Sequence, residues 1–266
     1  MSRLGLAVHR FRPDALEVAG RVISWATTNG YEVVVDESDL ASIRSDAVTR
    51  GDVGDVDVLV SIGGDGTMLR SVHALNGRTV PLIGVNLGQL GYLAVVEDDE
   101  VIEALEVWHN GTEGSEYHYD DRMLLEVSMW ANGARLSNHL AMNEVVIEKS
   151  EAGHTVRLGV DIDKAMFTTY AADGLILATP TGSTAYSMSA RGPILSPRLR
   201  AILMTPVSPH MLFDRSMVLD PQELVRIEIL GHRSVNVATD GELVHTLRPG
   251  DIVEVRAAQE VARFVR

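Results

Sequence analysis

The first part of the chain alternates between apolar runs and segments with helical spacing. Runs rich in Val, Ile and Leu indicate buried strands, and apolar residues that recur every three or four positions indicate amphipathic helices. Strands that alternate with helices are joined by right-handed crossovers, so this part is expected to be an α/β domain with a parallel sheet. Residues 36–54 are polar and poorly periodic, which predicts a loop with at most a short helix. The predicted strands are residues 4–8, 31–35, 56–62 and 80–85, and the predicted helices are residues 14–28, 67–75 and 98–108.

The pattern changes near residue 110, where Asn110-Gly111 ends the last helical segment. We expect two domains: an α/β amino-terminal domain over residues 1–110, and a β-rich, β-sandwich-like carboxyl-terminal domain over residues 111–266. The last residues of the chain are expected to pack back on the first domain. The β-rich segments are residues 123–130, 135–140, 145–148, 156–162, 166–171, 175–179, 201–204, 224–230, 234–239 and 252–256.

The third predicted strand ends at a glycine-rich loop, Gly63-Gly64-Asp65-Gly66-Thr67. Glycine permits positive φ and lets a ligand approach the backbone closely. Asp65 is therefore expected at the carboxyl end of a strand, where open α/β sheets bind ligands. Residues 87–93 form a second glycine-broken loop after the next strand, and two such loops on one edge of the sheet predict a crevice. A tight turn with a solvent-facing carboxylate is the alternative interpretation of the first loop.

The loop matches neither common nucleotide-binding motif. Leu69 stands where the dinucleotide fingerprint needs its last glycine. A P-loop lysine is also missing, because the only lysines are Lys149 and Lys164 and neither lies in a glycine-rich loop. Phosphate would have to be bound by backbone amides, arginines or a metal ion.

Composition narrows the class of protein further. A chain of 266 residues with 45% hydrophobic content can form one large domain or two ordinary ones. A formal charge of −14 argues against a nucleic-acid partner, although a local arginine cluster around a small anion is compatible with it. Cysteine is absent, and the longest apolar stretch, residues 81–96, is interrupted by polar residues and glycines. We expect a cytoplasmic protein with no membrane partner.

Residues 173–189 are the part of the second half that is richest in polar chemistry. An apolar strand leads into Thr179-Pro180-Thr181-Gly182-Ser183-Thr184, and a helix is predicted to begin near Ser183 or Thr184. A helix start dense in hydroxyls offers free N–H groups to an anion or to a polar nucleotide edge. An ordinary N-cap would explain one of these hydroxyls but not all of them. A serine nucleophile is disfavoured, because Ser183 lacks the second glycine of a nucleophile elbow.

Three shorter features complete the set of candidates. Asn143 and Glu144 lie between two β-rich segments, where their amide and carboxylate could bind ribose hydroxyls or a base edge, and a solvated turn is the alternative. His210 follows a proline-stiffened loop and is either a ligand contact or merely solvated. Asp240-Gly241 lies between two β-rich segments and predicts a hairpin turn.

Taken in order, these segments resemble the NAD kinase family. The resemblance runs from the first strand to about Val255, and its most specific part is Asp173 to Pro193. It implies an α/β amino-terminal domain packed on a β-rich carboxyl-terminal domain, and transfer of a phosphoryl group from ATP, or in some members polyphosphate, to the adenosine 2′-hydroxyl of NAD. Arg191 departs from the pattern, because the family usually has the first glycine of a Gly-Gly-Pro there. The segments that carry the resemblance are Gly63 to Thr67, Asn143-Glu144, Asp173 to Pro193, Pro209-His210 and Asp240-Gly241.

The resemblance also implies roles for individual residues. Asp65 would accept a proton and lie close to the metal-bound phosphates of the donor. Asn143 and Glu144 would hold the ribose and nicotinamide side of NAD. The donor loop that it implies is Gly63, Gly64, Gly66 and Thr67, and the NAD-binding residues are Asp65, Gly66, Tyr92, Leu93, Asn143, Glu144, Asp173, Thr184, Ala185, Tyr186, Ser187, Met188, Ser189, His210, Asp240 and Glu242.

The implied cofactor is Mg²⁺ or another divalent cation, which would be held through the donor phosphates near Asp65 and not by a protein metal motif. The implied partners are small-molecule nucleotides, and the implied assembly is a homo-oligomer, either a dimer or a tetramer. Two alternatives stay open. One is a non-catalytic NAD(H)-binding sensor, which Arg191 favours and Asp65 disfavours. The other is a lipid kinase with the same glycine loop, which the lack of a basic amphipathic segment disfavours.

Overall fold

A computed structural model describes residues 2–43, 45–88, 91–211 and 213–266. The chain divides into two compact units, one made of Met1–Asp121 with Val261–Arg266 and the other of Arg122–Glu260. The boundary expected at residue 110 falls at the end of helix α4, which belongs to the first unit together with the residues that follow it up to Asp121. Strands β7 and β18 contribute residues to both units.

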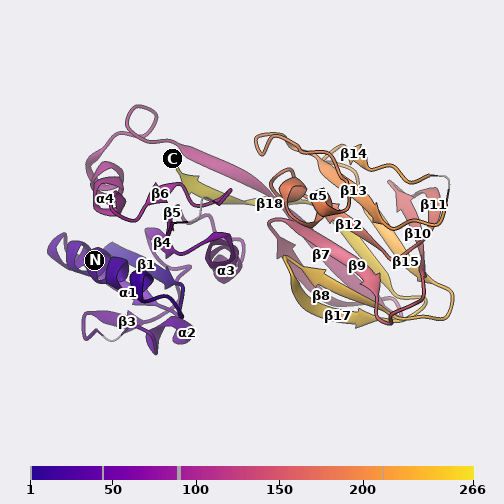
Figure 1. Ribbon diagram of the computed structural model, residues 1–266, viewed down its shortest axis with the longest axis horizontal. Coiled ribbons are helices and arrows are strands. Elements are labelled where there is room, and N and C mark those ends of the chain that lie inside the picture. The colour runs from indigo at the N-terminus through magenta and orange to yellow at the C-terminus, as the bar shows by residue number, and fades with distance from the viewer. Residues whose placement is uncertain (1, 44, 89–90, 212) are drawn as a thin grey trace. The chain divides into compact units, whose positions relative to one another are not determined.

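The first unit is a parallel sheet with helices on both faces (Figure 1). The strand order is β3-β2-β1-β4-β5, and every pair in this series is parallel. The end of β18 pairs with β5 in parallel through Phe264 and Leu82, and β6 also pairs with β5. The elements are β1 (Ser2–Val8), α1 (Pro13–Thr28), β2 (Tyr31–Val35), α2 (Glu37–Leu40), β3 (Val48–Arg50), β4 (Val58–Ile62), α3 (Asp65–Leu75), β5 (Leu82–Asn86), β6 (Val96–Glu97) and α4 (Val101–Asn110).

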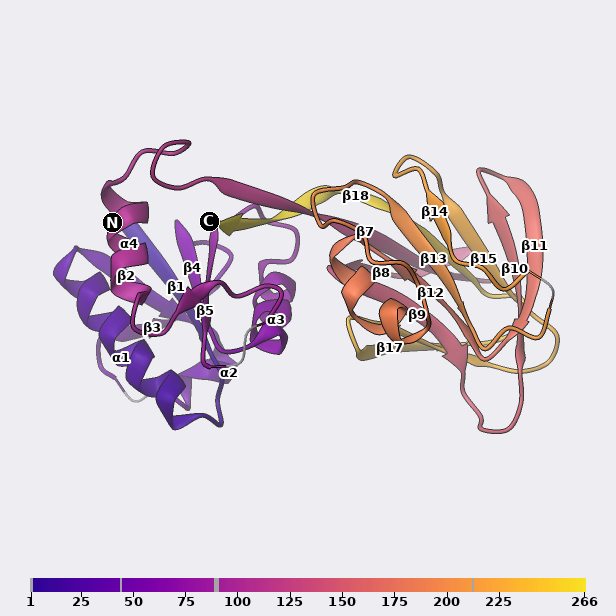
Figure 2. The ribbon, with the colours of Figure 1, turned by 45° about the horizontal axis from the view of Figure 1, so that its top comes forward.

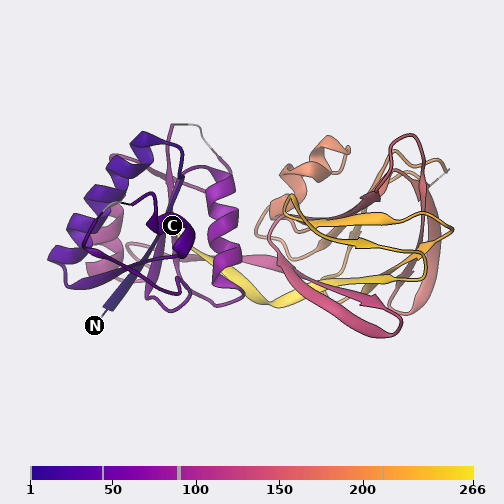
Figure 3. The ribbon, with the colours of Figure 1, turned by 90° about the horizontal axis from the view of Figure 1, so that it is seen from below.

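Helices α1 and α4 cover one face of this sheet and α3 covers the other (Figure 3). Pro13 suits the first position of α1, because its missing N–H has no intrahelical partner there. The strands β4 and β5 are buried along their whole length, as expected for a parallel sheet covered on both faces. The prediction of a loop with at most a short helix at residues 36–54 was wrong for β3, a three-residue edge strand of which only Val48 is buried.

The order of the strands reverses beside β1, because the chain passes from β1 to β2 on one side and later returns to β4 on the other. Open α/β sheets bind ligands outside the carboxyl ends of the strands at such a switch point. The loops that follow β1 and β4 are therefore the natural position for a ligand in this unit.

The second unit is a β-sandwich (Figure 2). One sheet has the order β11-β10-β15-β18-β7-β8, and the other has the order β14-β13-β12-β9-β16-β17. A single apolar core contains residues from both sheets. The elements are β7 (Tyr119–Ala131), β8 (Ala134–Ala141), β9 (Glu144–Lys149), β10 (Val156–Ile162), β11 (Ala165–Ala172), β12 (Gly174–Ala178), the 3-10 helix η1 (Thr181–Thr184), α5 (Tyr186–Ser189), β13 (Ile202–Val207), β14 (Met217–Leu219), β15 (Val225–Leu230), β16 (Val235–Thr239), β17 (Glu242–Leu247) and β18 (Ile252–Val265).

Part of the second sheet is buried on both faces. Strands β15 and β16 alternate between buried and half-buried residues, as expected for a sheet with one covered face. Strand β12 is buried along its whole length, because Ala190 and Leu195 pack on the outer apolar cluster that includes Ile176 and Leu203. The hydroxyl-rich segment thus lies over β9, β12 and β13.

The helix predicted to begin near Ser183 or Thr184 is broken in the structure. It consists of η1 followed by the single turn α5, and Ala185 separates them with φ −93° and ψ −127°. The hydroxyl of Ser183 donates to the Pro180 carbonyl at 2.7 Å, and that of Thr184 donates to the Thr181 carbonyl at 3.2 Å. Side chains that bond to the backbone in this way compete with a regular helix.

No helix in the described part of the chain is both long enough and apolar enough to cross a membrane.

Candidate active site

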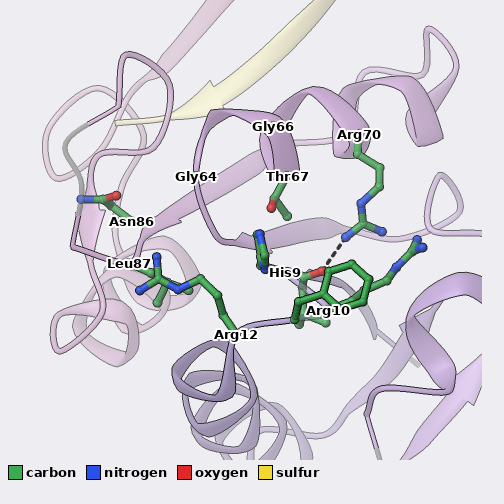
Figure 4. A pocket seen from close by; sticks show the side chains of 11 residues that line it. His9, Arg10, Arg12, Gly64, Gly66, Thr67, Arg70, Asn86 and Leu87 are labelled. Atoms are coloured by element: carbon green, nitrogen blue, oxygen red, sulfur yellow. Dashed lines mark hydrogen bonds between the residues drawn. The ribbon is translucent and has the colours of Figure 1, made fainter. Parts of the chain in front are cut away.

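A cavity of about 440 Å³ opens at the switch point of the first unit (Figure 4). Three loops form it, and they follow strands β1, β4 and β5, whose carboxyl ends share this edge of the sheet. The residues that line it are Val8, His9, Arg10, Phe11, Arg12, Gly64, Gly66, Thr67, Arg70, Asn86 and Leu87.

Three arginines make the cavity cationic. Arg10 and Arg70 are held by the fully buried carboxylate of Asp39, which accepts from Arg10 Nε at 2.8 Å and from Arg70 Nη1 at 2.8 and 2.9 Å. Arg70 also donates to the Val8 carbonyl at 2.6 Å (Figure 4). Arg12 is about two-fifths exposed and pairs with Asp14. Arginines beside the amino terminus of a helix form a site suited to phosphate.

The carboxylate of Asp65 joins the two glycine loops of the first unit. Asp65 is the first residue of α3, and its oxygens accept the N–H groups of Tyr92 at 3.0 Å and Leu93 at 3.1 Å. A Cβ atom at Gly91 would lie 2.2 Å from Asp65 Oδ1, so any other residue there would displace the Asp65 carboxylate. Residues 89 and 90 of the second loop lie outside the described residues.

The last residue of the chain supports this second loop from another direction. Arg266 Nη2 donates to the Leu93 carbonyl at 3.0 Å, while the backbone of Arg266 exchanges two hydrogen bonds with His118. Leu93 is buried and connects Arg266 to Asp65, because its carbonyl accepts from Arg266 and its N–H donates to Asp65.

The cavity contains residues that the sequence pattern did not single out, namely His9, Arg10, Arg12, Arg70 and Asn86. Only their position in the fold marks them as site residues: the first four lie after β1 or in α3, beside the point where the strand order reverses. That reversal is a property of the sheet and is not visible in the local sequence.

The polar site of the second unit is built around the turn Met142-Asn143-Glu144, which precedes β9. Thr179 holds one side of this turn, since its hydroxyl donates to the Met142 carbonyl at 2.6 Å and its N–H donates to the Asn143 carbonyl at 2.8 Å. Gly182 approaches the same peptide so closely that a Cβ atom there would lie 2.0 Å from the Asn143 oxygen. This contact explains why a glycine interrupts the run of hydroxyl residues.

Asp240 holds the other side of the turn. It lies in the predicted hairpin between β16 and β17, where Asp240 and Gly241 have φ 49° and 84°, as a two-residue type I′ turn requires. Its carboxylate accepts the N–H groups of Met142 at 2.7 Å, Asn143 at 2.7 Å and Glu144 at 3.0 Å. The hairpin prediction is confirmed.

Glu144 is a buried acid with 5% of its surface exposed. Burial, and then the nearby charge of Asp240, raise the pKa of Glu144 to about 7, against the lowering effect of the Tyr186 N–H, which donates to the carboxylate. Tyr186 has a partly exposed ring. Its own pKa is raised by burial and by the charges of Glu148, Asp173 and Glu144.

The other predicted residues of the second unit differ in their surroundings. Asp173 forms an ion pair with Lys149, with 2.8 Å between Oδ1 and Nζ. Ser187 is buried and shares a hydrogen bond of 3.0 Å with Thr205. His210 is exposed, and its backbone N–H donates to the Ala171 carbonyl at 2.7 Å. The exposed or partly exposed members of the set are Thr184, Ala185, Tyr186, Met188, Ser189 and Glu242.

Arg191 ends the turn that follows α5. It adopts φ 66°, a left-handed conformation that favours glycine, and its N–H donates to the Met188 carbonyl at 3.0 Å. Its side chain is exposed, so an arginine fits here at the cost of backbone strain alone. Gly192 cannot be replaced as easily, because a Cβ atom there would lie 2.3 Å from Ser187 Oγ.

The structure therefore gathers the predicted residues into two sets. Asp65, Gly66 and the backbone of Tyr92 and Leu93 belong to the first unit. Glu144, Asn143, Asp240 and Tyr186 belong to the second. Among the described residues, no three His, Asp or Glu side chains are grouped as a metal site.

Solved structures of nucleotide kinases share this fold. The chain superposes on yeast NADH kinase complexed with NADH with a TM-score of 0.90 and 27% identity, which covers 100% of this chain and 83% of the yeast chain. An NAD kinase from Archaeoglobus fulgidus in complex with ATP gives a TM-score of 0.75 at 21% identity, over 98% of this chain and 92% of that one, and shows the fold alone. The chain thus has the two-domain fold of NAD and NADH kinases.

Sequence comparisons define the family. The ATP-NAD kinase N-terminal domain model matches residues 4–112, and the ATP-NAD kinase C-terminal domain model matches residues 142–266. The NAD kinases of Syntrophotalea carbinolica and Heliobacterium modesticaldum are 38% and 35% identical over 100% of this chain, and the matches cover 93% and 94% of those proteins. The chain belongs to the NAD kinase family. It is a kinase that phosphorylates NAD, and the predicted family, fold class and enzyme class are confirmed.

Proposed function

We propose that the phosphoryl donor binds in the arginine-lined cavity, that NAD binds at the Met142–Glu144 turn, and that Asp65 accepts the proton of the adenosine 2′-hydroxyl. The observation that carries this proposal is the position of Asp65. It begins α3 between Gly64 and Gly66, which both line the cationic cavity, and two backbone N–H groups fix its carboxylate.

The reaction follows from these parts. The 2′-oxygen of NAD forms a bond to the γ-phosphorus, the bond from that phosphorus to the bridging oxygen of the donor breaks, and the hydroxyl proton moves to Asp65. Each oxygen of Asp65 that accepts an N–H group has a second lone pair for that proton. A positioned base contributes roughly 10²–10⁴ in rate. The arginines and the amino terminus of α3 stabilise the charge of the phosphates.

Magnesium is proposed to enter with the donor phosphates. Mg²⁺ is usually bound by one or two carboxylates together with substrate phosphates and water, so the donor phosphates and Asp65 would hold the ion. When bound, the ion neutralises phosphate charge.

NAD, the phosphoryl acceptor, is proposed to bind through Asn143 and Glu144. An amide and a carboxyl group on one turn match the hydroxyls of a ribose. Thr179, Gly182 and Asp240 hold this turn rigidly, which lowers the entropy cost of binding. NADH is a second acceptor to examine, because the yeast relative is an NADH kinase.

The same proposal includes a role in NADP biosynthesis in the cytoplasm and a homo-oligomeric assembly. Membership of the NAD kinase family supports these statements. Light scattering of the purified protein measures the assembly, and a mass equal to that of one chain would contradict it.

The central test is an Asp65→Asn variant assayed for NADP with NAD, ATP and Mg²⁺. We expect kcat to fall by roughly 10²–10⁴ while calorimetry shows unchanged NAD binding. Asp99→Asn, which changes an exposed carboxylate of the same unit, is the matched control and should keep full activity. Unimpaired turnover of Asp65→Asn would remove Asp65 from the role of base.

A donor and acceptor panel separates the remaining candidates. Wild-type protein is incubated with ATP or polyphosphate as donor and with NAD or NADH as acceptor, and the phosphorylated product is separated by chromatography. Product from ATP and NAD supports the proposal. Binding of NAD without product from either donor would indicate a non-catalytic sensor.

A further inference from the structure

The carboxylate of Asp240 is engaged by the protein backbone. Oδ1 accepts the N–H groups of Asn143 and Glu144, and Oδ2 accepts that of Met142. The N–H of Asp240 in turn donates to the Glu144 carbonyl at 2.9 Å. One side chain thus fixes three consecutive peptide groups.

Glu144 lies in the field of this carboxylate and has little access to water. Its Oε2 atom has no hydrogen-bond partner among the described residues, although the side chain is 95% buried, so a buried polar atom is left for a ligand. A neutral carboxyl has an O–H group to donate, whereas an ionised one can only accept.

The charged groups around this site are mostly acidic. Asp240 faces Glu144 from the β16–β17 turn, and Tyr186 faces it from α5. Glu148 acts on Tyr186 from β9, and Asp173 acts on it from the position before β12, where Lys149 forms an ion pair with Asp173. An NAD molecule adds the negative charge of its pyrophosphate, which a second buried carboxylate would repel.

We propose that Asp240 is a positioning residue for NAD: its carboxylate fixes the backbone from Met142 to Glu144, and it thereby holds the buried carboxyl group of Glu144 in place to donate a hydrogen bond to the dinucleotide. This rests on the proposed binding of NAD at Asn143 and Glu144. The resemblance to the family implies that Asp240 binds NAD, whereas the geometry points to an action through Glu144.

The pH dependence of NAD binding follows in sign from this arrangement. The pKa of Glu144 is raised to about 7, first by burial and then by Asp240, so the protonated form dominates below about pH 7 and is lost above it. If the protonated form alone binds, the Kd for NAD increases by at most about tenfold per pH unit above that value.

The experiment measures the Kd and KM for NAD between about pH 5.5 and about pH 8.5. Wild-type protein is compared with Asp240→Asn, which keeps the shape of the side chain and removes its charge. The expected result is a step in the wild-type profile near pH 7 that moves to lower pH in Asp240→Asn. A role in folding alone would raise the Kd by the same factor at every pH, and that outcome overturns the proposal.

Glu144→Gln keeps the proposal testable if Asp240→Asn fails to fold. Glutamine has an N–H donor and does not titrate, so the profile of Glu144→Gln should be flat and close to the low-pH limit of the wild type. A step that persists in Glu144→Gln overturns the proposal. Asp251→Asn is the matched control, because Asp251 also accepts a backbone N–H at a turn of this unit, from Arg248 at 2.8 Å, and its change should leave the step in place.

The two proposals fail in different ways. Wild-type protein that binds NAD with the step near pH 7 but makes no NADP refutes the proposed reaction. It supports the proposal that a protonated Glu144 binds NAD. Wild-type protein that makes NADP with no such step refutes the proposal that a protonated Glu144 binds NAD, and it supports the proposed reaction. Absence of NAD binding overturns both.

Discussion

Replacement of Gly182 by alanine tests how rigidly the Met142–Glu144 turn is held. Gly182 lies in η1, and its Cβ atom would be 2.0 Å from the Asn143 oxygen and 2.4 Å from the Asn143 carbonyl carbon. Real Cβ atoms essentially never come closer than 3.0 Å to another heavy atom, so the Asn143 peptide and Gly182 must separate by about 1 Å. The contact is with backbone, which cannot rotate away as a flexible side chain can.

The cost follows from what holds that peptide. The Asn143 carbonyl accepts from the Thr179 N–H at 2.8 Å, and the N–H of the same peptide group, that of Glu144, donates to Asp240 at 3.0 Å, so a shift of this size breaks or lengthens one of these bonds. Overpacking costs ~1–3 kcal/mol, and loss of one such hydrogen bond costs ~1–2 kcal/mol. We expect a total of about 3 kcal/mol, which corresponds to a decrease in Tm of roughly 10 °C for a domain of this size.

The assay combines thermal unfolding with kinetics. Gly182→Ala should unfold at lower temperature, and its kcat/KM for NAD should fall roughly 10- to 100-fold, because a displacement of 1 Å in a binding site has effects of that order. The matched control is Gly20→Ala in α1, where an added Cβ meets nothing within 4 Å and alanine favours the helix by ~0.5–1 kcal/mol. If Gly182→Ala matched the wild type in both Tm and kcat/KM, the close approach to Asn143 would not constrain the site.

Two further predictions concern charge. Folding raises the pKa of Glu144 to about 7, chiefly by burial, so its ionisation costs stability above about pH 7 and costs nothing below the ordinary value near 4.5. Glu144→Gln should therefore increase the free energy of unfolding by on the order of 1–3 kcal/mol at about pH 8 and by little at about pH 5; equal melting differences at both pH values would contradict this. Arg12→Ala should raise the KM for the donor roughly tenfold and leave the KM for NAD unchanged, whereas Arg50→Ala, an exposed arginine outside the cavity, should change neither.

The sequence predicts the main elements of the fold because their patterns are local. The strand before Gly63 is a β-branched run, and α1 has an unbroken apolar stripe with proline at its first position. The edge strand β3 was missed, because three residues with two exposed side chains carry no periodic signal. The break at Ala185 was missed for another reason, since it depends on hydroxyls that bond to nearby carbonyls.

The sequence predicts less of the candidate site than of the fold. Asp65 is visible as a carboxylate between glycines at a strand end. The cationic wall of its cavity is not, since Arg10 and Arg70 are distant in the chain and are brought together by Asp39, which belongs to a segment expected to be mostly loop. The role of Asp240 likewise depends on a pairing between β9 and β16 that no local pattern specifies.

The contact between Arg266 and Leu93 extends the surroundings of Asp65 to a distant part of the sequence. Leu93 accepts a hydrogen bond from Arg266 at its carbonyl and donates its N–H to Asp65, so Arg266 is two hydrogen bonds away from the proposed base. A substitution at Arg266 would therefore act on the loop that orients Asp65, although neither Arg266 nor its neighbours in the sequence line the cavity.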